Sequence, residues 1–322
     1  RPYYPDRRGF TDVFYGATQS YWANYDLDGK DVKPAKRVRK TGYRLDIQTD
    51  AALAFIDRNA GKPFFLYLPY YAPHVPLEAT DKYLERFPGE MPERRRMALA
   101  MMAAIDDGVG RIRDRLAKYK LTENTLIFFI SDNGAPLKAD MKDLPLTHKK
   151  GAWNGSRNDP WVGEKGMLAE GGIRVPFIVS WPGTLPAGKI YKHPVSSLDV
   201  GATAVELAGM ERPAEFDGVN LIPYLTEKIK TAPHAILFWR FWNQSAVRKG
   251  KWKYYQAGDR KFLFDLESPE HEKLNRIKEH PKLAKELEAS LQAWAKDLKN
   301  PGVPKGELNV SELKWVEYFL PK

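Results

Sequence analysis

The sequence has no cysteine, no long apolar run and no initiating methionine. Without cysteine the chain can form no disulfide bond, thiolate metal site or cysteine nucleophile, although this absence does not identify a compartment. Apolar runs such as residues 126–130 are far too short to cross a bilayer, so we expect a soluble protein. Residues 1–8 have neither the apolar core nor the cleavage site of a signal peptide, which predicts that the chain begins within a longer protein.

The charge balance favours basic residues. The 322 residues include 51 Lys and Arg against 41 Asp and Glu, which gives a formal net charge of +10. This surplus favours polyanionic partners, of which nucleic acid, an anionic polysaccharide and a small anionic ester are candidates. Charge alone does not choose among them.

Three short apolar runs organise the first two thirds of the chain: residues 64–68, 126–130 and 177–181. Their composition is typical of strands buried on both faces of a parallel sheet. Apolar residues recur at helical spacing in residues 43–59 and 92–120, and a helix that leads into a strand is half of a βαβ unit. The sequence therefore predicts an α/β fold with a mostly parallel central sheet.

A second, smaller domain is expected at the C-terminus. Residues 235–266 alternate aromatic and polar positions, which predicts antiparallel strands, and residues 279–298 form an amphipathic helix. We therefore expect a main α/β domain over residues 1–234 and a C-terminal α+β domain over residues 235–322. Residues 1–40 are expected to be loop with short elements.

Polar side chains follow two of the apolar runs. Asp132 and Asn133 come directly after residues 126–130, and such adjacent oxygen donors suit part of a Ca²⁺ or Mg²⁺ shell. The alternative is an Asx-turn that only caps the strand. His74 follows residues 64–68 on a loop stiffened by Pro73 and Pro76, although a histidine on a loop can also be incidental. In open α/β sheets ligands bind at the edge where strands end.

The long segment 137–163 leads into Gly163-Glu164-Lys165-Gly166 and then Glu170-Gly171-Gly172-Ile173-Arg174-Val175-Pro176. A loop of this length inside a compact domain is usually functional. Its glycines allow a close backbone approach or a positive φ, which an ordinary surface loop rarely needs.

Other conspicuous residues are expected to be structural. Asp106 and Asp107 are neighbours on a helix, so their side chains point about 100° apart and do not easily share one ligand. The Arg94-Arg95-Arg96 run is expected to be a solvated first turn or an ion-pairing face. Core packing is favoured over stacking on a sugar or aryl group for three tryptophans of the C-terminal region, Trp239, Trp242 and Trp252.

These motifs, in this order and strand context, resemble the sulfatase family of the alkaline-phosphatase-like superfamily. The resemblance rests on Ala-Pro-His-Val-Pro at residues 72–76, Ser-Asp-Asn-Gly at residues 131–134 and the two glycine-rich segments, and it covers nearly the whole chain. It implies an alkaline-phosphatase-like sandwich whose N-terminal strands are missing from these residues. It also implies a sulfuric ester hydrolase acting on an aryl or carbohydrate sulfate.

The resemblance also implies roles for individual residues. Asp132 and Asn133 would be two ligands of a divalent cation, Ca²⁺ or Mg²⁺. Lys165 would bind the sulfate and the leaving-group oxygen, and His74 would hydrogen-bond a sulfate or leaving-group oxygen. A cation, an ammonium and an imidazole aimed at the oxygens would neutralise developing charge and protonate the leaving group. We therefore expect His74, Asp132, Asn133 and Lys165 to converge on one pocket.

The sequence also departs from the family. Sulfatases carry a Cys- or Ser-x-Pro-x-Arg segment, whose first residue is oxidised to a formylglycine nucleophile, and an N-terminal Asp-Asp pair on their first strand; neither occurs here. The nucleophile and the remaining cation ligands are thus expected in an N-terminal part outside these residues, either on the same chain or on a companion chain.

Two alternatives stay open: a phosphodiesterase or phosphonate-monoester hydrolase on the same scaffold, and a non-catalytic anion- or glycan-binding remnant. The expected partner is a sulfated small molecule or glycan, with no nucleic acid and no membrane. The resemblance suggests a periplasmic or secreted location.

Overall fold

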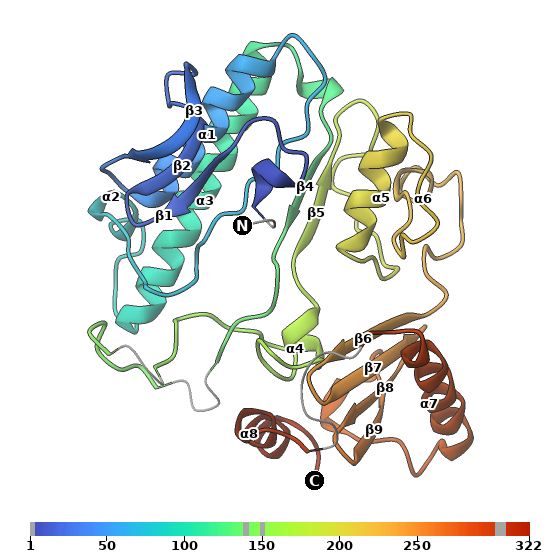
Figure 1. Ribbon diagram of the computed structural model, residues 1–322. Helices are drawn as coiled ribbons and strands as arrows, with labels where there is room; N and C mark the ends of the chain where they lie inside the picture. Colours follow the sequence, from blue (N-terminus) through green and yellow to red (C-terminus); the bar gives the residue numbers. More distant parts are fainter. Residues whose placement is uncertain (1–3, 138–141, 149–151, 300–306) are drawn as a thin grey trace. The chain divides into compact units, whose positions relative to one another are not determined.

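The computed structural model describes residues 4–137, 142–148, 152–299 and 307–322, and the chain divides into two compact units (Figure 1). The first unit comprises residues 1–125 and 142–156, and the second comprises residues 126–141 and 157–322. Residues 157–234 therefore group with the C-terminal sheet, and the division at residue 235 stays a prediction. None of the helices in the described ranges has both the length and the hydropathy needed to cross a bilayer.

The first unit opens with an antiparallel sheet of strands β1 (Phe14–Ala17), β2 (Ser20–Tyr25) and β3 (Asp31–Arg39). The prediction of loop with short elements over residues 1–40 is therefore wrong. The signal that identifies a strand here is the alternation in β2, where every second side chain is buried. Strand β3 lacks this signal, because it is charged and largely exposed and an exposed edge strand needs no apolar pattern.

Two long helices carry the core of the first unit and confirm the predicted helical runs. Helix α1 (Arg44–Asn59) packs against α3 (Glu93–Lys118), and the short α2 (Asp81–Leu84) lies against α3 as well. Two short 3-10 helices complete the unit, Pro5–Arg7 and Thr122–Asn124. The prediction of a buried strand at residues 64–68 is wrong, because these residues form no strand ladder and Phe65 and Tyr67 are exposed.

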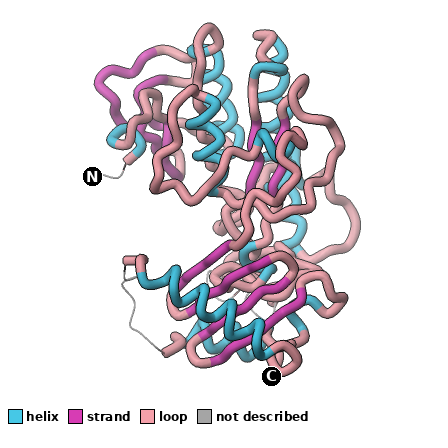
Figure 2. Tube along the Cα trace, turned by 90° about the vertical axis from the view of Figure 1, so that its right-hand side faces the viewer, coloured by secondary structure: helices cyan, strands magenta, loops and turns pink. Residues whose placement is uncertain are grey.

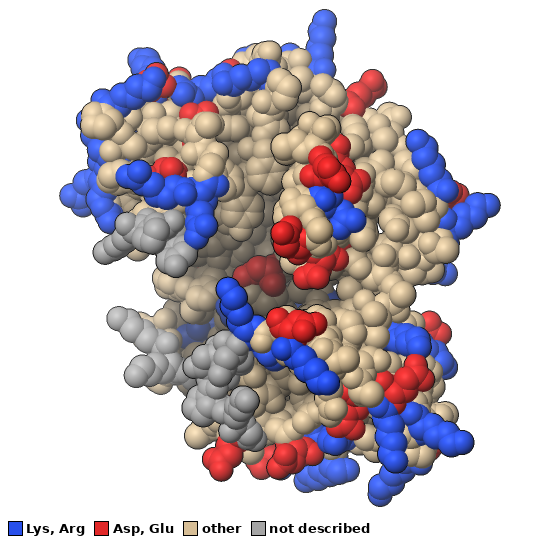
Figure 3. Space-filling view, turned by 45° about the vertical axis from the view of Figure 1, so that its right-hand side comes forward, with Lys and Arg blue, Asp and Glu red and all other residues tan. Residues whose placement is uncertain are grey.

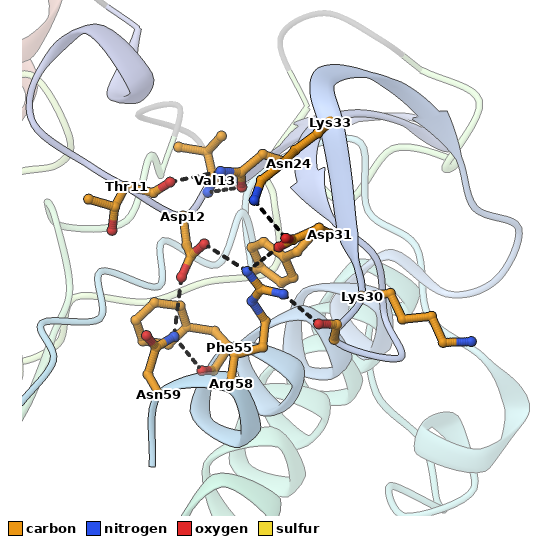
Figure 4. Close-up of polar contacts among 12 residues, drawn as sticks. Thr11, Asp12, Val13, Asn24, Lys30, Asp31, Lys33, Phe55, Arg58 and Asn59 are labelled. Carbon is orange, nitrogen blue, oxygen red and sulfur yellow. Dashed lines mark hydrogen bonds and ion pairs between the residues drawn. The ribbon is translucent and has the colours of Figure 1, made fainter. Parts of the chain in front are cut away.

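Arg58 at the end of α1 joins this helix to the N-terminal sheet (Figure 4). Its guanidinium lies 2.8 Å from Asp31 and 3.3 Å from Asp12, and it also donates to the Gly29 carbonyl. The neighbouring Asn59 donates to Asp12 at 3.2 Å. A planar guanidinium can satisfy several acceptors at once, so one side chain fixes the sheet against the helix.

The second unit begins with β4 (Ile127–Ile130), which pairs with β5 (Phe177–Ser180). The register pairs Ile127 with Ser180 and Ile130 with Phe177, so the two strands run antiparallel, and the expectation of parallel pairing is wrong for them. An apolar run indicates a strand but not its direction, and mixed sheets are common. The expected burial on both faces is not seen either, since no β4 side chain is fully buried and Ile178 is exposed.

The C-terminal sheet confirms the predicted antiparallel strands. Its order is β6 (Leu237–Phe241), β7 (Gln244–Lys249), β8 (Trp252–Ala257) and β9 (Arg260–Asp265). Helix α7 (Pro281–Lys296) lies across one face (Figure 2), where Leu287 and Leu291 pack on Val247, Tyr254 and Leu263. Trp252 packs against this cluster, so the core reading of that tryptophan holds.

The opposite face of the C-terminal sheet is covered by α8 (Val310–Phe319) and by part of the glycine-rich segment of residues 163–176 (Figure 1). Met167 and Leu168 of that segment pack on Tyr255 and Phe264 of the sheet, together with Val316 of α8. Trp239 packs against the same cluster. The unit also contains α4 (Glu170–Ile173), α5 (Leu198–Leu207), α6 (Ile222–Leu225) and a 3-10 helix at His271–Lys273. The sheet is thus the foundation on which the segment carrying Lys165 rests.

Candidate functional site

Asp132 and Asn133 lie on the turn that leaves the end of β4. Asp132 is exposed and Asn133 is half-buried. Within the described residues neither side chain makes a hydrogen bond or an ion pair, whereas the Ser131 hydroxyl donates to the Asn133 carbonyl at 3.0 Å. An Asx-turn would tie the Asp132 carboxylate to nearby backbone, and no such bond occurs in this part of the structure. Its oxygens are therefore available to a ligand.

The loop that carries Lys165 is joined to this turn backbone to backbone. The Lys165 amide donates to the Ala135 carbonyl at 3.1 Å, and the Gly134 amide donates to the Gly172 carbonyl at 2.9 Å. A Cβ at Gly134 would collide with the Gly171 carbonyl, so only glycine permits this approach. The structure thus brings the Asp132-Asn133 and Lys165 segments together, although 33 positions separate Asp132 from Lys165.

Asn158 reinforces this junction, and the sequence analysis did not single it out. Its side chain accepts from the Ala135 amide at 2.8 Å and donates to the carbonyls of Ala135 at 2.9 Å and Gly163 at 3.0 Å. One amide side chain therefore holds the turn after β4 and the start of the Lys165 loop at a fixed spacing. Asparagine in an irregular loop carries no local pattern that would reveal such a role.

The C-terminal sheet and α8 hold the Lys165 loop from its other side. Trp315 of α8 donates from Nε1 to Glu164 at 2.6 Å, and its ring fills the space beside Gly166, which has a φ of +98°. Gln244 of β7 donates to the Gly166 carbonyl at 2.9 Å. The Lys165 side chain itself is half-buried and has no polar partner in the described ranges. The neighbours on both sides of Lys165 are anchored, while its ammonium group stays available.

His74 belongs to the first unit and is exposed. Its Nδ1 lies 2.7 Å from the Val75 carbonyl, and because a carbonyl only accepts, Nδ1 carries the proton of that bond. This leaves Nε2 for a ligand. His74 and Lys165 lie in different units, so their convergence stays a prediction.

The structural role expected for Asp107 agrees with the ion pair that it forms, whereas the role of Asp106 stays a prediction. Asp107 forms a two-pronged pair with Arg86 at 2.8 and 2.7 Å. The expectation for Arg94 is wrong, because its side chain is buried and donates to four carbonyl groups of the segment 142–156, those of Leu144, Pro145, His148 and Trp153. Three adjacent arginines suggest a solvated face, and only the fold shows which of them points inward.

A buried charge cluster lies at Glu170, between the Lys165 loop and the C-terminal sheet. The Lys253 ammonium of β8 lies 3.0 Å from Glu170 and 2.9 Å from Glu272, and all three side chains are almost completely buried. Glu272 also accepts from the Glu170 amide at 2.6 Å. Arg174 and Arg248 lie 3.6 and 3.8 Å from the second oxygen of Glu170. This cluster fixes the glycine-rich segment where it meets the sheet.

The two carboxyl groups of the cluster have opposite pKa shifts. Burial raises the pKa of Glu272 to about 7, which Lys253 only partly opposes and the nearby Glu170 reinforces. Burial also disfavours ionised Glu170, but Lys253, Arg248 and Arg174 outweigh burial and lower its pKa. One ammonium therefore serves two carboxylates, and the cations on the far side of Glu170 decide which of them keeps its charge.

We predict a pH dependence of stability from Glu272. The folded protein retains the proton on Glu272 up to about pH 7, whereas the unfolded chain releases it near its ordinary pKa of 4.5. The unfolded state therefore binds fewer protons between these two values, so the contribution of Glu272 to stability falls as the pH rises from 4.5 to 7. Glu170 has the opposite sign, since its contribution is lost only as the pH falls below 4.5.

The measurement is the thermal midpoint of unfolding of the wild type and of Glu272→Gln at pH 5, 6 and 7. The difference between the two proteins should change steadily across this window, because only the wild type titrates at this position. Glu286→Gln, a change at an exposed surface pair, serves as the control and should leave the wild-type profile intact. Parallel profiles for the wild type and Glu272→Gln would contradict the prediction.

The donors on this chain fit part of a metal shell. No group of three or more His, Cys, Asp or Glu side chains able to hold a metal ion occurs among the described residues. The unpartnered Asp132 carboxylate and Asn133 carboxamide suit Ca²⁺ or Mg²⁺ chemically, but Ca²⁺ takes roughly six to eight oxygens. These two residues fit such an ion only if other ligands complete the shell.

Figure 3 shows how the charged side chains are distributed on one face of the protein. On the surface shown in Figure 3, lysine and arginine side chains are spread out and lie among aspartate and glutamate side chains. The surplus of basic residues therefore forms no continuous single-sign field on that face.

Comparisons with known proteins concern the family of the chain and its fold. A family model described as "Sulfatase" matches residues 2–210, and one described as "N-sulphoglucosamine sulphohydrolase, C-terminal" matches residues 161–299. An uncharacterized sulfatase, YdeN, of Escherichia coli (strain K12) is 34% identical over 73% of this chain and 40% of its own length. The N-acetylgalactosamine-6-sulfatase of Sus scrofa is 31% identical over 78% of this chain and 48% of its own length. The chain thus spans less than half of these relatives.

Solved structures give the same result for the fold. The crystal structure of Ps i-CgsB in complex with k-i-k-neocarrahexaose has a TM-score of 0.78 and 30% identity, and the match covers 98% of this chain and 72% of that one. A phosphonate monoester hydrolase, SpPMH from Silicibacter pomeroyi, matches with a TM-score of 0.61 at 20% identity over 92% of this chain and 68% of that one, which shows a shared fold alone. The α/β fold with a C-terminal antiparallel sheet is thereby confirmed.

Proposed function

Because this chain belongs to the sulfatase family, we propose that the protein containing it hydrolyses a sulfate monoester. The observation that carries the proposal is the backbone junction between the turn of Asp132 and Asn133 and the loop of Lys165. It places available oxygen donors and an available ammonium group on adjoining loops, an arrangement suited to holding an anionic ester.

In the proposed reaction Lys165 binds a sulfate oxygen and the leaving-group oxygen. Charge grows on the leaving oxygen as its bond to sulfur breaks, and the Lys165 Nζ ammonium stabilises that charge and donates a proton to it. Because both flanking residues of Lys165 are anchored, its backbone needs little reorganisation. His74 would offer Nε2 to a sulfate or leaving-group oxygen.

We further propose that Asp132 and Asn133 hold a divalent cation, Ca²⁺ or Mg²⁺, whose chemistry is to draw charge from the sulfate oxygens. The remaining ligands and the nucleophile, a formylglycine by family resemblance, belong to a part of the protein outside these residues. That part is either continuous with this chain or a companion chain.

We propose a sulfated glycan as the substrate class. Two similarities support it: the relative named N-acetylgalactosamine-6-sulfatase and the structure solved with neocarrahexaose. An aryl sulfate offers the same reacting group without the sugar, so it serves as a minimal substrate.

The test is hydrolysis of nitrophenyl sulfate and nitrophenyl phosphate by the full-length protein. We expect kcat/KM for the sulfate to exceed that for the phosphate by at least about tenfold, which corresponds to about 1.4 kcal/mol in the transition state. A clear preference for the phosphate would instead favour the phosphonate or phosphodiester hydrolases that share this fold. No turnover of either ester would favour a non-catalytic binding protein.

A further inference from the structure

An aromatic stack on the surface of the second unit continues from the Lys165 loop. Phe241 and Trp242 stack with ring centroids 4.9 Å apart, and Trp242 stacks on Trp315 at 6.3 Å with an interplanar angle of 15°. Phe241 is 40% and Trp242 38% exposed. Trp315 lies against Gly166, the neighbour of Lys165. Large exposed rings in one patch usually mark a binding surface.

Trp242 also has an unfavourable backbone conformation. It is the first residue of the two-residue turn between β6 and β7, and its φ is +51°. Hairpins commonly place glycine at a turn position with positive φ, because a bulky side chain is strained there. Such strain persists only where the surroundings impose it, and it is concentrated at functional sites.

The surroundings do impose this conformation. Asn243, the second turn residue, donates its backbone amide to Glu312 at 3.0 Å and its side-chain amide to the Glu307 carbonyl at 2.6 Å. Gln244 then bonds Gly166 and Glu312. The hairpin tip is therefore fixed to α8 and to the Lys165 loop by the same few residues. The turn that carries Trp242 is therefore tied to the backbone beside Lys165.

We propose that the stack of Phe241, Trp242 and Trp315 is a glycan subsite that binds the sugar ring next to the sulfated one. One face of a pyranose ring carries a row of C–H groups that pack on a flat aromatic ring, and a rigid exposed tryptophan provides such a surface at low entropic cost. The inference rests on the proposed function in taking the ligand to be a sulfated glycan. It adds that the chain beyond the reacting sugar is recognised.

The decisive variant is Trp242→Gly, because glycine suits the positive φ and the hairpin should fold at least as well. For the full-length protein, we expect the Kd of neocarrahexaose, measured by calorimetry, to weaken about tenfold. The Kd of the desulfated hexasaccharide should increase by the same factor, since the stack contacts the face of the sugar ring and not its sulfate. Hydrolysis of nitrophenyl sulfate, which has no second sugar ring to bind the stack, should keep its wild-type kcat/KM.

Trp242→Phe should retain part of the affinity, and Tyr318→Ala, a change at an exposed aromatic elsewhere on α8, should leave the Kd unchanged. An unchanged hexasaccharide Kd in Trp242→Gly would overturn the inference, as would failure of the wild type to bind the hexasaccharide. Loss of binding together with a lower thermal midpoint would also overturn it, because the stack would then serve the fold. If the wild type binds the hexasaccharide through Trp242 but hydrolyses no sulfate ester, the glycan subsite is supported and the proposed function is refuted.

Discussion

Replacing Lys165 with methionine should lower the kcat of the full-length protein on nitrophenyl sulfate by about two to three orders of magnitude. One preorganised charged contact that strengthens as the leaving oxygen gains charge is typically worth about 3–4 kcal/mol in the transition state. Methionine keeps the length and apolar stem of the side chain and removes only its charge and its proton. Because the Lys165 side chain has no polar partner in the described ranges, the change should not destabilise the fold.

The loss should depend on the leaving group. A nitrophenolate leaves readily without a proton, whereas a sugar alkoxide does not, so the glycan sulfate should suffer more than the aryl sulfate. Lys192→Met, a change at an exposed lysine of the same unit, is the control and should retain wild-type turnover. A Lys165→Met protein with nearly wild-type kcat on both substrates would show that Lys165 takes no part in the chemistry.

Replacing Lys253 with methionine should lower the free energy of unfolding by about 3–5 kcal/mol at pH 8, because Glu170 and Glu272 would stay buried without their ammonium group. The loss should be smaller at pH 5, where the unpaired carboxyl groups can take up protons. Urea denaturation at the two pH values measures both quantities. Since Glu170 fixes the Lys165 segment to the sheet, turnover should fall along with stability.

Lys249 of the neighbouring strand provides the control for this experiment. It pairs with Glu286 at 2.7 Å, but both side chains are more than half exposed. Such a surface pair is worth about 0–1 kcal/mol, so Lys249→Met should have little effect. Adding Glu272→Gln to Lys253→Met should recover part of the lost stability, because one uncompensated buried charge is then removed. Equal losses from Lys249→Met and Lys253→Met would refute the burial argument.

The sequence predicts those elements of the fold in which apolar residues recur at a regular spacing. Apolar periodicity predicts helices α1, α3 and α7 and the C-terminal hairpins, because the local geometry of a helix or strand determines which residues share a face. The direction of β4 relative to β5 does not follow, because an apolar run looks alike in parallel and antiparallel pairs. The N-terminal sheet was missed because only β2 has a buried face to reveal it.

The candidate site divides in the same way. Asp132, Asn133 and Lys165 stand in recognisable motifs, whereas the residues that hold these motifs do not. Glu272 and Lys253 lie 102 and 83 positions from Glu170, and no local pattern links residues so far apart. Trp242 was expected in the core because aromatic residues usually pack there, and only the turn geometry places it at the surface.

The interleaving of the two units has a consequence for biosynthesis. The first unit includes residues 142–156, which come after the start of the second unit at residue 126. Arg94 of α3 donates hydrogen bonds to carbonyl groups in residues 142–156. The first unit can therefore fold completely only after residue 156 has been synthesised. Strand β4 can pair only after β5 has been synthesised. Domains that follow one another in sequence can fold one after the other during synthesis. The folding of these two units is therefore expected to overlap in time during synthesis.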